Sequence, residues 1–171
     1  MARLPRTLRQ EPKPRNSLPM IPLLIPLGTG KCSTFGGMAD KGVGTKEELS
    51  CVGISDFSEW WFRRIFLAPG DYSSAYGPAR NLDPAAFYCA CRWAYGSFQG
   101  VQGEILPGYT REQVRRGVVI VSANGKNVAC QAADFGPNPD TKRLIDLSPG
   151  AATALGVKTD DTVSVQFLPL L

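Results

Sequence analysis

Two β-prone runs on either side of Asn124-Gly125 constrain the fold of this chain more than any other feature. The runs cover residues 118–122 and 127–134. Asn and Gly both accept the positive φ angles of a two-residue hairpin turn. The chain also has 18 glycines and 14 prolines in 171 residues, which favours short strands joined by turns over a helical bundle. We therefore predict a mainly β fold, and the length suits one domain with its own core plus an extension.

Two short helices are predicted around this hairpin. Thr110 and Gln113 have the spacing of a capping box, which predicts a helix that ends before Gly117. After a short buried strand at 144–147, Ser148 is placed to cap a second helix with Pro149 in its first turn and Gly156 at its end. Residues 162–167 predict the last strand, with these apolar side chains on one face: Val163, Val165 and Phe167.

The region before residue 110 predicts further strands and a long loop. Residues 31–35, 49–55 and 60–67 are strand candidates. Residues 71–84 are rich in turn-forming residues and predict a loop insertion near 68–85, of a length that is usually functional or held by a partner. Residues 86–95 alternate as a strand, with Tyr88 and Arg92 opposite a face formed by Phe87, Cys89, Cys91, Trp93 and Tyr95.

Residues 1–30 are predicted to form an extended, proline-rich arm, and residues 31–171 the domain. Residues 1–16 hold five basic side chains and one acidic one, 5 − 1 = +4, which equals the net charge of the whole chain. A neutral domain does not favour nucleic acid as a partner, except through the basic arm. Because a solitary arm cannot offset the entropy lost on ordering, we expect it to lie across another protein chain in an oligomeric assembly, with apolar contacts from Ile21, Leu23, Leu24, Ile25 and Leu27.

The apolar stretch at 18–27 is interrupted by three prolines and is too short to span a bilayer. It makes a poor secretory signal, so we expect synthesis in the cytoplasm without export by the general secretory route. The five cysteines match no zinc-site spacing, and the chain has no histidine. We expect mainly buried thiols, with one disulfide left open, and neither a metal nor another cofactor.

The order of motifs in the last third of the chain resembles the rare lipoprotein A-like double-psi β-barrels, a group related to the expansins and to lytic transglycosylase A. The motifs are Asp134 before Gly136-Pro137, the strand core Ile145-Asp146-Leu147-Ser148, the small-residue helix Pro149-Gly150-Ala151-Ala152 and the stop Leu155-Gly156. The resemblance implies a six-stranded double-psi β-barrel that binds or cleaves peptidoglycan or a related polysaccharide.

The resemblance puts Asp146 first among the catalytic candidates, and Asp134 is the other acid of the motif. Asp40, in the loop at 38–42, is a third candidate that could face the same groove. A general acid needs a carboxyl group whose pKa is raised by partial burial, so that it can protonate a glycosidic oxygen near neutral pH. Two alternatives stay open for Asp146: this acid, or a turn carboxylate that accepts backbone amides and has a lowered pKa. Asp134 is interpreted first as the residue that holds the Gly136-Pro137 turn and second as another groove carboxylate. Hydrolysis by paired carboxylates would need Asp40 or Glu104 near Asp146.

The substrate-binding candidates are Trp93, Tyr95, Asn138 and Arg143. Aromatic faces beside polar groups bind sugars, and Trp60, Trp61, Tyr72 and Tyr76 could contribute as well. The competing interpretation places the tryptophans in the core, because they bury so much apolar area. Related barrels often use a histidine, and its absence here excludes a histidine-assisted mechanism.

The sequence therefore leaves two alternative functions open. One is a cell-wall enzyme or an expansin-like binder with a groove around Asp146. The other is a structural or assembly protein, such as a bacteriophage virion or tail component, that keeps the barrel without catalysis. A fold alone does not choose between them.

Overall fold

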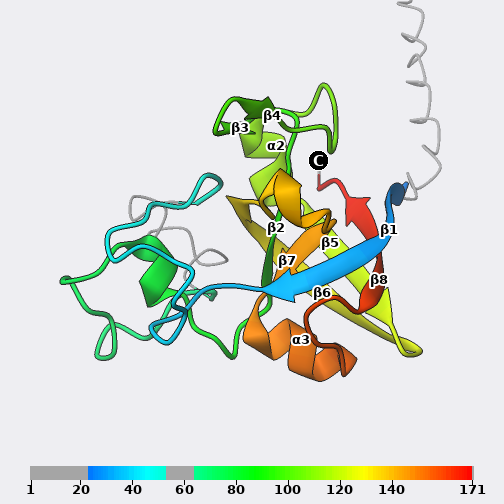
Figure 1. The fold of residues 1–171 in the computed structure, drawn as a ribbon. Coiled ribbons are helices and arrows are strands. Elements are labelled where there is room, and N and C mark those ends of the chain that lie inside the picture. Colours follow the sequence, from blue (N-terminus) through cyan, green and yellow to red (C-terminus); the bar gives the residue numbers. More distant parts are fainter. Residues whose placement is uncertain (1–22, 53–63, 171) are drawn as a thin grey trace, which may run out of the picture.

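The computed structural model describes residues 23–52 and 64–170. Its described part is mainly β, with the order of elements shown in Figure 1. The strands are β1 (Ile25–Thr34), β2 (Tyr88–Cys91), β3 (Ser97–Phe98), β4 (Val101–Gln102), β5 (Val118–Ala123), β6 (Lys126–Phe135), β7 (Ile145–Leu147) and β8 (Thr162–Leu168). The α-helices are α2 (Arg111–Arg116) and α3 (Pro149–Leu155), and the short 3-10 helices are η2 (Pro78–Asn81) and η3 (Pro139–Thr141).

Six of these strands form a closed barrel in the order β1-β7-β2-β6-β5-β8. The pairs β1/β7 and β2/β6 are parallel, and the other neighbours in the barrel are antiparallel. Closure removes the exposed strand edges that an open sheet would present. The predictions of a mainly β fold, of six barrel strands and of short helices are confirmed.

The local signals of the last third of the chain act as predicted. Asn124 and Gly125 adopt φ angles of 51° and 71° between β5 and β6. Thr110 and Gln113 form the capping box of α2. The Ser148 hydroxyl accepts a hydrogen bond from the Ala151 amide at 3.1 Å and caps α3, which ends at Gly156 with a left-handed φ of 70°.

Strand β1 crosses the predicted boundary between arm and domain at residue 30, because it already begins at Ile25. Ile25 pairs with Phe167 of β8, and both Ile25 and Leu27 pack against the barrel core. The register shifts between Pro26 and Gly28, where Gly28 has a φ of 129°. Proline is tolerated in a strand at such a bulge, which is why the proline pattern hid this strand. The rest of the predicted arm, residues 1–22, lies outside the described residues.

Strand β2 is buried on both faces rather than on one. Tyr88, Cys89, Ala90 and Cys91 are each exposed by 2% or less. The inner face contributes Cys89 and Cys91 to the core, while the outer face at Ala90 is covered by Gly136, where an added Cβ atom would lie 3.7 Å from the Ala90 Cβ. The prediction of a strand over 86–95 therefore holds only for these four residues, and they do not show an alternation of buried and exposed side chains.

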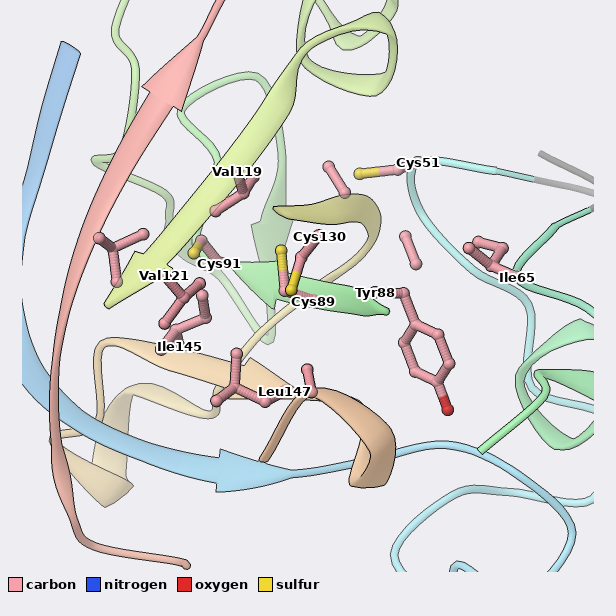
Figure 2. Packing of buried hydrophobic residues seen from close by; sticks show 14 of the residues in the cluster. Cys51, Ile65, Tyr88, Cys89, Cys91, Val119, Val121, Cys130, Ile145 and Leu147 are labelled. Carbon is pink, nitrogen blue, oxygen red and sulfur yellow. The ribbon is translucent and has the colours of Figure 1, made fainter. Parts of the chain in front are cut away.

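The barrel interior is filled by branched aliphatic side chains and cysteines (Figure 2). All five cysteines of the chain are buried and free, which confirms the prediction of buried thiols. The inward side chains of the strands include Val119, Val121, Cys130, Ile145, Leu147, Val163, Val165 and Phe167.

The segments 35–52 and 64–87 form a lobe of loops beside the barrel (Figure 1). Asn81 is fully buried in it and holds the predicted loop insertion: its side chain accepts from the Ser73 amide at 2.9 Å and donates to the Ser73 and Gly77 carbonyls. Residues 49–52 form no strand, and in the described part of the 60–67 candidate the pairing is a single bridge from Phe66 to Leu82. The remaining residues of both strand candidates lie outside the described ranges.

Candidate functional site: an acidic row across four strands

Two of the predicted carboxylates lie in one row on the outer face of the barrel. Ser33 of β1 pairs with Asp146 of β7, Asp146 pairs with Ala90 of β2, and Ala90 pairs with Asp134 of β6. Residues paired across neighbouring strands point to the same face. We call Ser33, Asp146, Ala90 and Asp134 the acidic row. Its two carboxylates are two strands apart, which corresponds to about 10 Å between their backbones at the usual strand spacing.

Asp146 is half-buried at the centre of this row. Its Oδ1 accepts a hydrogen bond from the Ser33 hydroxyl. Burial raises the pKa of the Asp146 carboxyl, against the lowering effects of the Ser33 hydrogen bond and of the Arg143 charge. Among the described residues, the Ala151 amide at the start of α3 donates to the Ser148 hydroxyl and not to Asp146. A raised pKa and a hydroxyl partner suit a proton donor better than a turn carboxylate.

Asp134 has a different environment. Its Oδ1 accepts from the backbone amides of Ser50 and Phe135, both at 2.8 Å, and so ties the loop after Leu49 onto β6. Burial raises the pKa of Asp134 to about 6, although both amide bonds act to lower it. These bonds favour a structural role for Asp134, through Ser50 rather than through the predicted Gly136-Pro137 turn.

Asp40 closes the loop that follows β1. Its Oδ2 accepts from the Gly36 amide at 2.7 Å and its Oδ1 from the Gly42 amide at 2.8 Å. The charge of Asp40 is among the causes that raise the pKa of Asp146. Asp40 is thus an electrostatic neighbour of Asp146, but both of its oxygens already hold the loop.

The predicted aromatic platform is not formed by Trp93, which is fully buried. Its Nε1 donates to the Asp134 carbonyl at 2.7 Å. The prediction for Trp93 is therefore wrong, because a side chain without exposed area has no face to offer a sugar, and the core interpretation holds. Tyr95 is half-buried and its hydroxyl lies 2.6 Å from the Cys51 Sγ. Trp60 and Trp61 lie outside the described residues.

Asn138 and Arg143 both lie in the segment between β6 and β7. Asn138 is exposed, and its Oδ1 accepts from the Asp140 amide at 3.0 Å as the cap of η3. Arg143 donates to both carboxylate oxygens of Asp160, at 3.0 and 3.2 Å. Since the Arg143 charge lowers the pKa of Asp146, its guanidinium acts on the same site.

Sequence reasoning misses the roles of two residues at this site. The sequence places Ser33 only within a strand candidate, and its partnership with Asp146 depends on the parallel pairing of β1 and β7. It places Arg92 only on the outer face of a strand. The Arg92 Nη1 donates to the Arg143 carbonyl at 2.8 Å, and the Arg92 charge lowers the pKa of Asp146. Neither contact has a local sequence signal.

Comparisons with known proteins identify no family. No family model matches the chain, and no curated protein matches it either. A solved structure that it resembles is the Streptomyces papain inhibitor, which is 18% identical, with 84% of this chain and 98% of that chain covered and a TM-score of 0.43. A likeness this distant assigns neither family nor activity.

Two further observations concern the described ranges 23–52 and 64–170. Within them, no group of three or more His, Cys, Asp or Glu side chains is arranged to hold a metal ion. No helix in the same ranges is both long enough and apolar enough to cross a bilayer.

Proposed function

We propose that this protein is a cell-wall polysaccharide-binding or polysaccharide-cleaving barrel of the double-psi type, similar to rare lipoprotein A, with Asp146 as its general acid. The observation that carries the proposal is the half-buried Asp146 carboxyl on the outer barrel face, hydrogen-bonded to a hydroxyl and with a raised pKa. The two parallel strand pairs in a closed six-stranded barrel support the assignment to the double-psi type.

The chemistry follows from this carboxyl group. A protonated Asp146 donates its proton to the glycosidic oxygen as the bond from that oxygen to the anomeric carbon breaks. The resulting carboxylate then accepts the proton of the hydroxyl that attacks the anomeric carbon, so that protons balance over the cycle. In lytic cleavage this hydroxyl belongs to the substrate itself, and a single acid is sufficient. The Ser33 hydroxyl orients the carboxyl group and stabilises its charged form.

Substituting Asp146 with Asn tests the proposal on purified peptidoglycan. In a zymogram we expect D146N to lose cleavage while its free energy of unfolding stays within about 1 kcal/mol of the wild type. Asp140→Asn is the matched control, because Asp140 is exposed on the neighbouring loop. Undiminished cleavage by D146N would remove Asp146 from any catalytic role, and a large loss of stability would mark it as structural.

A second candidate function, an assembly protein of a virus particle, is favoured by another observation. Leu23 and Leu24, immediately before β1, are 78% and 40% exposed. Large apolar side chains at this level of exposure at the start of an apolar segment are typical of a contact with another chain. A wild-type protein that neither binds nor cleaves peptidoglycan but forms a defined oligomer would favour this candidate.

A further inference from the structure

A cleft away from the acidic row opens on the outer surface of β5 and β6. It has a volume of about 890 Å³, within the range of binding sites for small molecules and peptide segments. Its lining is mostly apolar and includes Phe87, Val118, Ala129 and Leu170. Phe87 and Leu170 are 39% and 54% exposed, so the cleft presents an aromatic and an aliphatic side chain to an incoming segment.

The chain enters the barrel at the same end as this cleft. Ile25 at the start of β1 pairs with Phe167, while Val118 at the start of β5 pairs with Leu168. The start of β1, the end of β8 and the start of β5 are therefore adjacent, as the positions of these strands in Figure 1 also show. The exposed Leu23 and Leu24 directly precede this end of the barrel.

The sequence before β1 matches the cleft in chemistry. Residues 18–24 read Leu-Pro-Met-Ile-Pro-Leu-Leu, without a charged side chain and with two prolines. Proline-rich segments dock into aromatic-lined grooves at low entropic cost, because they are already extended. Because charged side chains are costly to place in a mostly apolar cleft, the neutral stretch suits it better than the basic residues 1–16.

We propose that residues 18–24 of one copy of this chain occupy the cleft of a second copy, and that the exchange is reciprocal. Leu23 is 78% exposed, so its side chain does not pack on its own barrel. A reciprocal exchange uses the same surfaces in both copies and closes as a two-fold dimer. This inference rests on the proposed assembly role and is independent of chemistry at Asp146.

Light scattering after size-exclusion chromatography tests the dimer with the full chain. We expect a wild-type dimer whose dissociation constant rises at least tenfold in Ile21→Asp and in Ala129→Asp. Ala129 is an exposed cleft residue, so the second change tests the receptor side without altering the core. The matched control is Val101→Asp, a 44% exposed apolar position on the β3–β4 hairpin outside the cleft, which should leave the dimer unchanged. A wild-type monomer at all concentrations would overturn the inference, while an assembly role through a different protein chain would stand apart from that result.

Cross-linking identifies the docking partner. Two differently tagged proteins, one carrying Ile21→Cys and the other Ala129→Cys, are mixed and mildly oxidised; the native cysteines are buried. We expect a mixed disulfide dimer, and none when Val101→Cys replaces Ala129→Cys. A wild type that is dimeric but gives no cross-link would refute the cleft as the docking site while leaving the assembly role intact. In a double variant with both cysteines, a disulfide within a monomer would show that the arm occupies its own cleft, and would overturn the exchange.

Discussion

The wild type is expected to lose stability between pH 4 and pH 7 as the Asp134 carboxyl ionises. Replacing Asp134 with Asn should abolish this loss. Burial raises the pKa of Asp134 from an ordinary 3.8 to about 6, so the folded state binds this proton more tightly than the unfolded chain does. The stabilisation is complete below about pH 4 and disappears as the pH rises through 6. At 1.36 kcal/mol for each pKa unit, the loss is on the order of 3 kcal/mol.

The asparagine side chain keeps an oxygen for the amides of Ser50 and Phe135 but has no proton to lose. Urea unfolding at pH 4 and pH 7 measures the effect. The stability of D134N relative to the wild type should increase by about 2 to 3 kcal/mol between the two pH values. The raised pKa of Asp146 is common to both proteins and cancels in this difference. An increment independent of pH would refute the reasoning.

Three further substitutions test the packing, each by urea unfolding. A methyl group on Gly117 would lie 2.1 Å from the Phe167 Cζ, so Gly117→Ala should cost about 2 kcal/mol or more, and a neutral result would show that Phe167 moves freely. The methyl group of Gly125→Ala meets no atom within 4 Å, but alanine must adopt a φ of 71°, so the substitution should cost only about 1 kcal/mol of stability. If it cost as much as Gly117→Ala, a steric clash would not be more destabilising than an unfavourable backbone angle, contrary to the prediction. Ser148→Ala removes the acceptor for the Ala151 amide at the start of α3 and should cost about 1 to 2 kcal/mol, whereas unchanged stability would show that the cap is dispensable.

The parts of the fold that sequence could predict are those with a local cause. The turn at Asn124-Gly125, the capping box of α2 and the Ser148 cap of α3 each depend on residues within a few positions of one another. Their conformational preferences therefore act in the same way in the sequence and in the folded chain. The six-strand count was implied by the resemblance, which rests on the order of such short motifs, and the buried thiols follow from the number and spacing of the cysteines.

The parts that sequence could not predict depend on distant neighbours. The start of β1 is defined by pairing with Phe167, and the proline at position 26 masked it. Trp93 lies in the core because its indole reaches the Asp134 carbonyl, a partner far along the chain. The acidic row depends on how the strands pair. Its two carboxylates were predicted as candidates, but no sequence signal predicts that the pairing of β1, β7, β2 and β6 places them in one row.

Burial raises the pKa of both carboxyl groups in the acidic row, yet it leads to different roles. The Oδ1 atom of Asp134 is held by two backbone amides, which cannot turn away, and protonating this group changes how firmly the Ser50 loop is held. Asp146 has instead the Ser33 hydroxyl, whose hydrogen can rotate, and lies among Arg143, Arg92 and Asp40, whose charges act on its pKa in opposite directions. A group of this kind can take up and release a proton without rearrangement of the backbone. Substitution at either position should therefore change the pH dependence of stability, but under the proposed function only substitution at position 146 should also abolish cleavage.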